Sequence, residues 1–320
     1  MLSRAQARET LLAIHASLSA AQVASFLTVY RMRAIAIEEL LGFRDALLEL
    51  AIPLDLQGQT TIDIVGTGGD GKNTFNISTT SALVVAGAGY KVTKHGSYGV
   101  SSSVGSSDLL TSLGYVFTND QAVLLRMLDE ANICFLHAPV FHPALKAVVP
   151  VRRELGVQTF FNILGPLVNP AQPTHQLMGT FSQELSRLYH YVMQETGRAY
   201  TIVHALDGYD EVSLTGAARV HTPQSETLLH PSDFGLSYRS PNDLHGGDTA
   251  ADAREICTRI LQNQATAAQI DVVCANAGLA IQTLCPHKPL QDCVAEARES
   301  IANGSAFKAL GRVLQISNHT

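Results

Sequence analysis

The sequence predicts an α/β protein that combines a small N-terminal helical domain with a larger domain around a central, mostly parallel sheet. Residues 1–50 show helical periodicity and contain no strand-like run, which predicts the helical domain. Strand-like and helix-like segments then alternate, as in a parallel sheet covered by helices. Of the 320 residues 46% are hydrophobic and 16% charged. Ordinary globular domains contain about 25% charged residues, so this composition indicates a well-buried core.

Three helices are predicted before residue 50. The first carries apolar residues on one helical face, at Leu11, Leu12, Ile14 and Leu18. Ser19 then offers an N-cap for the second helix, and residues 37–50 form the third. Pro53 and the polar residues 57–59 end this block.

The change of pattern near residue 58 predicts a domain boundary. We expect a small helical domain over residues 1–58 and an α/β domain over residues 59–320. Residues 160–180 interrupt the later alternation with three prolines, and a hinge or domain crossing would need such a segment. We therefore expect part of 160–180 to join the helical domain.

The larger domain is predicted to alternate strands with helices and to end in helices. Strands are predicted at residues 61–65, 91–93, 134–136 and 201–204. Helices are predicted at residues 78–88, 107–113, 120–131, 143–155, 185–195, 250–262 and 267–284.

The composition disfavours several classes of protein. A net charge of −6 argues against a general affinity for nucleic acid. The five cysteines form no C-x-x-C pair and no zinc-type spacing, which is typical of free thiols in the cytoplasm. The N-terminus lacks the features of a signal peptide, and the most apolar run, residues 82–89, is too short to cross a membrane. We therefore expect a soluble, cytoplasmic protein without a membrane partner.

A glycine-rich loop follows the first predicted strand. Residues 66–71 read Gly-Thr-Gly-Gly-Asp-Gly and match the dinucleotide-binding pattern G-x-G-x-x-G. That pattern also needs an acidic residue about 20 positions later, and no Asp or Glu lies between Asp70 and Asp108. The loop nearly forms a P-loop as well, but Asn73 stands where a Mg²⁺-binding Ser or Thr is required. The missing acidic residue therefore argues against a dinucleotide-binding loop, and Asn73 argues against a P-loop.

The same loop retains the chemistry of anion binding. Glycines let backbone N–H groups approach an anion closely. Asn76, Ser78 and Thr79 begin the next predicted helix, where uncapped N–H groups favour negative charge. A helix cap would explain one of these residues, but not the whole run of glycines and hydroxyls. Asp70 would repel a bare phosphate, so its presence in the loop indicates a metal ion or a sugar hydroxyl nearby.

A second loop of similar character follows the next predicted strand. It begins with Lys94 and His95 and continues through residues 99–107, which are rich in glycine and serine. The carboxyl ends of parallel strands meet at one edge of a sheet, so the two loops are expected to form one ligand crevice. A plain surface loop is the alternative, and Lys94 is the positive charge that favours the crevice.

Two further pairs of charged residues fit such a crevice. Asp210 and Glu211 follow the strand predicted at 201–204, and Mg²⁺ is bound by one or two carboxylates together with substrate oxygens. Arg152 and Arg153 end the helix predicted at 143–155. A guanidinium can clasp a carboxylate with two hydrogen bonds, although arginines there can also simply compensate the helix dipole.

Several blocks of the chain, in this order, resemble the anthranilate phosphoribosyltransferase family over nearly the whole length. They are residues 63–79 (DIVGTGGDGKNTFNIST), 94–96, 137–139, 142–143, 150–156, 161–167, 169–170 and 207–211. The resemblance implies the fold of nucleoside phosphorylases and this type of phosphoribosyltransferase, with a homodimer formed through the helical domain. It also implies transfer of the phosphoribosyl group of phosphoribosyl pyrophosphate (PRPP) to the amino group of anthranilate, in tryptophan biosynthesis.

The resemblance further implies which residues bind each ligand. For PRPP they are Gly66, Gly69, Asp70, Thr74, Asn76, Ile77, Ser78, Thr79, Lys94, Ser101, Ser102 and Ser106. For anthranilate they are Gly66, Ser97 and Arg152, and for Mg²⁺ they are Ser78, Asp210 and Glu211. Typical members read Lys-His-Gly-Asn-Arg-Ser in the second loop, where this chain reads Lys-His-Gly-Ser-Tyr-Gly over residues 94–99. Ser97 thus places a hydroxyl where the family has an amide that touches anthranilate.

The implied reaction requires stabilisation of the departing pyrophosphate and alignment of donor and acceptor. No covalent nucleophile is expected, and His95 and His142 are the candidates to accept the amine proton. Two alternatives remain: a pyrimidine-nucleoside phosphorylase of related fold, and a non-catalytic binder of phosphorylated sugars or nucleic acid. Asp210, Glu211 and Arg152 favour an enzyme.

Overall fold

The computed structural model describes residues 1–99 and 104–319. Three helices open the chain, α1 (Arg4–Ala16), α2 (Ala20–Met32) and α3 (Ile37–Glu49). Ser3 and Ser19 cap the first two, because each side chain accepts a hydrogen bond from the N–H group three residues later. The predicted cap at Ser19 is therefore confirmed, whereas α1 begins well before the apolar run from which it was predicted.

The buried carboxylate of Glu39 ties these helices to one another. It accepts two hydrogen bonds from the guanidinium of Arg33, at 2.6 and 2.7 Å, and one from the hydroxyl of Tyr30 at 3.1 Å. It also accepts the backbone N–H groups of Leu2 and Ala36, at 2.8 and 3.0 Å. Burial opposes ionisation, but these donors outweigh it and lower the pKa of Glu39 to about 2.

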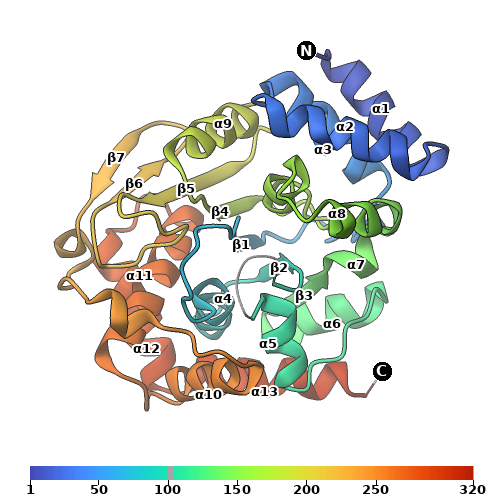
Figure 1. The fold of residues 1–320 in the computed structure, drawn as a ribbon. Coiled ribbons are helices and arrows are strands. Elements are labelled where there is room, and N and C mark those ends of the chain that lie inside the picture. The colour runs from blue at the N-terminus through green and yellow to red at the C-terminus, as the bar shows by residue number, and fades with distance from the viewer. Residues whose placement is uncertain (100–103, 320) are drawn as a thin grey trace.

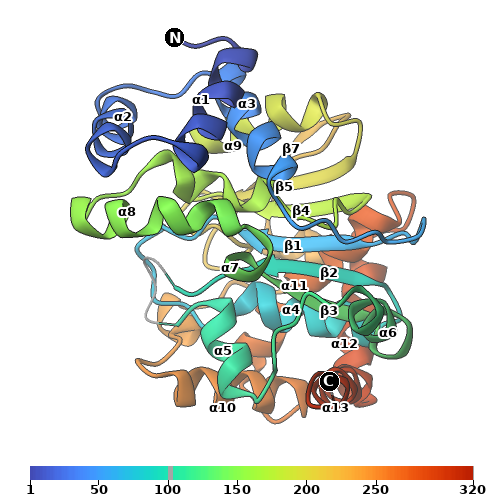
Figure 2. The ribbon, with the colours of Figure 1, turned by 90° about the vertical axis from the view of Figure 1, so that its right-hand side faces the viewer.

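The centre of the molecule is a seven-stranded sheet in the order β3-β2-β1-β4-β5-β6-β7. Its first five strands are parallel: β1 (Ile62–Gly66), β2 (Val92–Gly96), β3 (Ile133–His137), β4 (His175–Gly179) and β5 (Ala199–Ala205). The last two, β6 (Ala218–His221) and β7 (Glu226–Leu229), are antiparallel. The prediction of a mostly parallel sheet beside a helical domain is confirmed (Figures 1 and 2).

Helices cover the sheet on both faces. One face packs on α4 (Ile77–Gly87), α11 (Ala267–Leu284) and α13 (Ser305–Ser317). Helix α12 (Leu290–Ala302) packs on α4 and α11, and α10 (Ala250–Leu261) packs on α4 and α5 (Ser106–Ser112). The other face contributes Met178 and Ile202 to a second core that includes α9 (Gln183–Gln194) and the N-terminal helices. Figure 2 shows α1 to α3 on that side of the sheet, next to α8 and α9. Helix α6 (Gln121–Ala131) lies beside β3.

The region 138–180 differs from the prediction. The single helix expected at 143–155 is wrong, since a 3₁₀ helix (Pro143–Ala147) precedes a separate helix α8 (Val149–Leu155), and α7 (Ala138–Phe141) comes before both. Pro150 lies in the first turn of α8, where its lack of an N–H group breaks no helical hydrogen bond. The proline-rich stretch holds two 3₁₀ helices, Phe160–Ile163 and Gly165–Leu167, and then the unpredicted central strand β4.

Three neighbouring strands end in glycine at the same edge of the sheet. Gly96 ends β2, and Gly66 and Gly179 end β1 and β4, where they are paired with each other. The chain order reverses between β1 and β4, so this is the point of a parallel sheet where ligands bind. No helix among the described residues is long and apolar enough to cross a membrane.

Candidate active site

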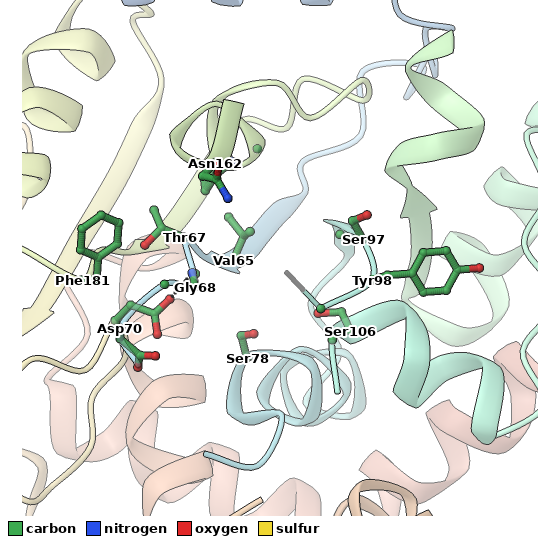
Figure 3. Close-up of a pocket in the computed structure, with 18 of the residues that line it drawn as sticks. Val65, Thr67, Gly68, Asp70, Ser78, Ser97, Tyr98, Ser106, Asn162 and Phe181 are labelled. Carbon is green, nitrogen blue, oxygen red and sulfur yellow. Dashed lines mark hydrogen bonds between the residues drawn. The ribbon is translucent and has the colours of Figure 1, made fainter. Parts of the chain in front are cut away.

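A cleft of about 340 Å³ opens at the carboxyl ends of the central strands. Its floor comes from the loop after β1 and the first turn of α4, and its walls come from the loop after β2, the loop after β5 and the α8 region. Figure 3 shows Asp70 and Phe181 on one side, Ser97 and Ser106 on the other, and Ser78 below the opening. The two glycine-rich loops therefore share one crevice, as the sequence predicted.

Most of the implied PRPP residues line this cleft. They are Gly66, Gly69, Asp70, Thr74, Asn76, Ile77, Ser78, Lys94 and Ser106. Thr79 lies behind the lining instead, fully buried, and its hydroxyl donates to Ser106 Oγ at 3.0 Å. Ser101 and Ser102 lie outside the described residues. The implied anthranilate residues Gly66, Ser97 and Arg152 also line the cleft.

The N–H groups of the glycine loop and of α4 are partly occupied by the acid pair Asp210–Glu211. Gly68 N–H donates to Asp210 Oδ2 at 2.7 Å, and Ser78 N–H donates to Glu211 Oε1 at 2.8 Å. The expectation that the helix start is uncapped is therefore wrong for Ser78, because a carboxylate from the loop after β5 binds there. A phosphate group approaching the same donors would lie directly beside both carboxylates.

Burial raises the pKa of each of the three carboxyl groups in this region, Asp70, Asp210 and Glu211. Asp70 raises the pKa of Asp210 further, and both raise that of Glu211, because like charges in a poorly solvated site repel one another. Lys94 and Lys72 oppose these shifts, Lys72 at Asp70 and Lys94 at Glu211. Three carboxylates thus face two ammonium groups.

The donor set fits Mg²⁺. Asp210 and Glu211 offer hard carboxylate oxygens at a site of excess negative charge, with the hydroxyl of Ser78 beside them. Among the described residues no three His, Cys, Asp or Glu side chains are arranged to enclose a metal ion by themselves. Such a site suits an ion that arrives with substrate phosphate oxygens, which is how Mg²⁺ is commonly held.

Lys94 anchors the floor of the cleft from below. Its ammonium group is buried, and it donates to the carbonyl oxygen of Ile64 at 2.5 Å and to Ser78 Oγ at 3.4 Å. Burial lowers its pKa, which Asp63 and the acid pair oppose. Asp63 is itself buried and accepts from His95 N–H at 3.2 Å and from Asn169 Nδ2 at 2.8 Å. This network holds the end of β2 in place beside β1.

Arg152 forms the opposite wall of the cleft. It donates from Nη2 to Asn162 Oδ1 at 3.1 Å, while its Nε is buried without a partner. No acidic side chain among the described residues forms an ion pair with it, and burial lowers its pKa. The ring centroid of Phe161 lies 5.6 Å from the guanidinium carbon of Arg152. A half-buried arginine that faces a cleft and forms no ion pair with the described residues is suited to bind a carboxylate of a ligand.

The two candidate proton acceptors differ in position. His95 lines the cleft, and its Nδ1 lies 3.3 Å from the carbonyl oxygen of Gly165. His142 does not line it, and its Nε2 lies 2.9 Å from the carbonyl oxygen of Val168. Burial lowers the pKa of His95 to about 3 and that of His142 to about 4, so both imidazoles are neutral and weakly basic at physiological pH.

The sequence did not predict every residue that lines the cleft. Asn162 and Phe181 line it as well. Asn162 lies in the block 161–167 that resembles the family, but no role was predicted for it. The glycine loop is also backed by the segment before α10, where Gly246 N–H donates to the carbonyl of Asn73 at 2.8 Å. Only the folded chain brings residues 246 and 73 together. Tyr98, half-exposed, turns its ring away from the cleft onto His137, 4.8 Å between centroids (Figure 3).

The fold and this site define a glycosyl transferase. Residues 1–51 match the helical bundle domain of the glycosyl transferase family, and residues 58–307 match its a/b domain. Similar sequences are the anthranilate phosphoribosyltransferases of Cytophaga hutchinsonii, 53% identical with 98% of this chain and 96% of the relative covered, and of Flavobacterium psychrophilum, 51% identical with 99% and 96% covered. The chain belongs to the anthranilate phosphoribosyltransferase family and is an enzyme of that class.

Solved structures agree with this assignment. Anthranilate phosphoribosyltransferase from Thermus thermophilus superposes with a TM-score of 0.93 at 35% identity, covering 99% of this chain and 96% of that one. The Saccharomyces cerevisiae enzyme in complex with PRPP and Mg superposes with a TM-score of 0.93 at 28% identity, covering 100% and 94%. The same yeast enzyme is known in complex with 4-fluoroanthranilate, at a TM-score of 0.90, 28% identity and the same coverage.

Proposed function

We propose that this chain transfers the 5-phosphoribosyl group of PRPP to the amino group of anthranilate, releases pyrophosphate, and serves tryptophan biosynthesis. The observation that carries the proposal is one cleft whose floor and opposite wall differ in chemistry. The floor at Gly66 to Ser78 offers backbone N–H groups beside buried carboxylates, and the wall opposite offers Arg152, which has no acidic partner in the described part of the chain. A pyrophosphate-bearing sugar fits the floor and an aromatic carboxylate fits the wall.

The reaction exchanges one bond at the anomeric carbon of the sugar. The amine nitrogen forms a bond to that carbon, the bond to the pyrophosphate oxygen breaks, and the amine loses a proton. The chain must therefore stabilise the departing charge and hold the amine in line. The backbone donors of the glycine loop and Lys94 serve the first task. Arg152 serves the second by fixing the carboxylate of anthranilate.

We assign Mg²⁺ to Asp210, Glu211 and the hydroxyl of Ser78. When bound, the ion neutralises charge on the pyrophosphate as it leaves. The chain's own contribution is to keep the two carboxylates at the entrance of the glycine loop, where Gly68 and Ser78 bind them. The relatives known with Mg bound support this assignment.

The assignment of most remaining residues follows from their place in the cleft. We assign Gly66, Gly69, Asp70, Thr74, Asn76, Ile77, Lys94 and Ser106 to PRPP, together with Thr79 as the residue that orients Ser106. We assign Ser101 and Ser102, which lie outside the described residues, to PRPP from the family resemblance alone. We assign Ser97 and Gly66 to the acceptor beside Arg152. No side chain is assigned to take the amine proton, since His95 and His142 are weak bases.

We further propose that two copies of the chain form a dimer through the helical domain of residues 1–58, with part of 160–180 joined to it. Val29 and Met32 on α2 and Val149 on α8 are exposed apolar residues, 49%, 82% and 44% accessible. Burying them between two copies would remove this apolar surface from water. Sedimentation velocity, with Met32→Glu as the variant, tests the dimer.

All five cysteines are free thiols, which fits a cytoplasmic enzyme.

The test of the reaction uses the fluorescence of anthranilate. Anthranilate, PRPP and Mg²⁺ are incubated with the protein, and we expect the fluorescence to fall only when all are present. If it stays constant while phosphate cleaves thymidine, the chain is a phosphorylase. If neither reaction occurs but PRPP binds, the chain is a binder without turnover.

A further inference from the structure

The middle of helix α11 carries a buried asparagine among apolar residues. Asn276 is 3% exposed, and Val272, Ala277 and Ala280 on the same helix are fully buried. A buried amide in such surroundings is costly unless its donors and acceptor are paired. The partners of Asn276 therefore indicate why a polar side chain lies there.

The amide of Asn276 binds both polar backbone groups of a single residue, Val212. Its Oδ1 accepts from Val212 N–H at 3.0 Å, and its Nδ2 donates to the Val212 carbonyl oxygen at 2.8 Å. The second hydrogen of Nδ2 goes to the carbonyl of Val272 within α11, at 2.8 Å. Sixty-four residues separate the two partners in sequence. Such a two-point contact fixes the orientation of the bound peptide as well as its position.

Val212 directly follows the acid pair Asp210–Glu211. The loop that carries the pair leaves β5 and returns to β6, and its two ends are joined by Leu206 N–H donating to the Ala217 carbonyl at 2.9 Å. Between these ends the acid pair lies against the glycine loop on one side. On the other side, the backbone is held by Asn276 from the core. A rotation of the peptide at Val212 would therefore move Glu211 away from Ser78.

We propose that Asn276 is a positioning residue for the acid pair: it fixes the backbone of Val212, so that Asp210 and Glu211 present their carboxylates to a magnesium-bound pyrophosphate group. The inference rests on the proposed function, since it names what aligns the pair assigned there to Mg²⁺. Asn276 does not line the cleft, so it acts through the loop and not on the ligand.

Asn276→Ser separates this role from simple stabilisation of α11. A serine hydroxyl can still donate to the Val272 carbonyl four residues earlier, but it is too short to hold both groups of Val212. Thr283→Val is the matched control, because Thr283 is a buried polar residue of the same helix. Its hydroxyl contacts Thr201 Oγ1 at 2.7 Å and the Leu279 carbonyl at 2.9 Å, away from the acid pair.

The first measurement is binding, without turnover. The Tm of the full chain is followed as Mg²⁺ is added at constant inorganic pyrophosphate. A fit of the rise gives the apparent Mg²⁺ affinity, because the stabilisation grows with the logarithm of 1 + [Mg²⁺]/Kd. We expect Asn276→Ser to weaken that affinity by about ten- to hundredfold, the usual effect of losing a group that orients a metal ligand. Thr283→Val should leave it unchanged. The Mg²⁺ concentration for half-maximal turnover should shift in parallel, with KM for anthranilate unaffected.

The outcomes are distinguishable. If Asn276→Ser lowers the Tm of the free protein but keeps the wild-type Mg²⁺ affinity, Asn276 is only structural and the inference is overturned. If Thr283→Val weakens Mg²⁺ binding equally, the effect belongs to α11 in general and the inference is again overturned. If the wild-type protein itself shows no Mg²⁺-dependent binding of pyrophosphate, the proposed function fails. Should the serine variant not fold, Asn276→Asp, which keeps the acceptor for Val212 N–H, is measured in its place.

Discussion

The main-chain carbonyl oxygen of Asp210 occupies the space where a side chain on Gly179 would begin. A methyl group built on Gly179 would overlap that oxygen, and one on Gly66 would contact the carboxylate of the same aspartate. Gly66 and Gly179 are paired across β1 and β4. The loop that carries the acid pair therefore lies directly on the ends of the two central strands, and it can lie there only because both are glycines.

Gly179→Ala should displace the acid pair and lower activity. The clash is with backbone, which cannot rotate away as a side chain can, so the loop after β5 must shift. We expect kcat to fall by about 100-fold, since a displacement near 1 Å at a reacting centre has an effect of that order. Overpacking should also lower the free energy of unfolding by about 1–3 kcal/mol. Steady-state kinetics and urea denaturation measure the two effects.

Gly311→Ala is the control for that substitution. Gly311 lies within α13, and no described residue lies within 4 Å of the added methyl group. Alanine should stabilise the helix there by about 0.5–1 kcal/mol and leave turnover unchanged. Equal losses of activity in both variants would contradict the contact with Asp210 as the cause.

Asp210→Asn should stabilise the protein in the absence of metal while impairing its use of Mg²⁺. Burial and the neighbouring Asp70 raise the pKa of Asp210, so the ionised carboxylate destabilises the folded state above the pKa of the unfolded chain. Asparagine keeps an oxygen for Gly68 N–H without the charge. At pH 8 and without metal, we expect the free energy of unfolding of the variant to exceed that of the wild type by about 1–2 kcal/mol. This gain should shrink as the pH falls towards 4.

The same variant should need more Mg²⁺ for half-maximal turnover, and adding Glu211→Gln should make the requirement larger still. Titration of the rate with Mg²⁺ measures this, and urea denaturation in EDTA measures the stability. Wild-type dependence on Mg²⁺ in the double variant would contradict the assignment of the acid pair to the metal.

The sequence predicted those parts of the fold that are encoded locally. Ser19 and Asp120 cap helices close to the predicted starts, and the strands at Ile62 and Ile133 follow from short apolar runs. Strand β4 was missed because it follows two 3₁₀ helices and a turn in a proline-rich stretch, so its central place is visible only through its pairing with β1 and β5. The hairpin of β6 and β7 was missed because β7 is largely exposed and lacks an apolar run.

The site was predictable where its residues recur as motifs and not where they act through distant partners. Gly66 to Ser78 stand in one stretch of sequence, and this stretch forms the floor of the cleft. Asn276, in contrast, meets Val212 across 64 residues, and a single asparagine in a helix has no sequence pattern that reports such a contact. The occupation of Ser78 N–H by Glu211 could not be read from the chain for the same reason.

Arg152→Ala should weaken the acceptor much more than the donor. Arg152 faces the cleft and has no acidic partner among the described residues, so in the proposed acceptor site its loss removes a charged hydrogen bond to the carboxylate of anthranilate. Such a bond contributes about 1.5–3 kcal/mol, which corresponds to a roughly 10- to 100-fold higher KM for anthranilate. The KM for PRPP should change little. Arg153→Ala, at the exposed neighbouring position, is the control, and equal effects on both substrates would remove Arg152 from the acceptor wall.

Glu39 should make the helical domain sensitive to acid. Burial opposes its ionisation, but Arg33, Ala36, Leu2 and Tyr30 bind the carboxylate and lower its pKa from 4.5 to about 2. A lowered carboxyl pKa stabilises the fold above the unfolded pKa, and that contribution is lost as the pH falls through the folded pKa. From the size of the shift we expect about 3 kcal/mol at pH 7, lost between about pH 4.5 and pH 2.

Glu39→Gln tests this contribution against Glu38→Gln, a change at the exposed residue beside it. At pH 7 we expect the Glu39 variant to unfold at lower urea concentration than the wild type, because neutral glutamine leaves the guanidinium of Arg33 without its counter-charge. Between about pH 4.5 and pH 2 the two curves should converge, because the unfolded wild-type chain is protonated first and the folded carboxylate loses its charge only near pH 2. The Glu38 variant should follow the wild type throughout. A Glu39→Gln deficit that stays constant from pH 7 to pH 3 would mean that packing at this position, and not the charge, stabilises the helices.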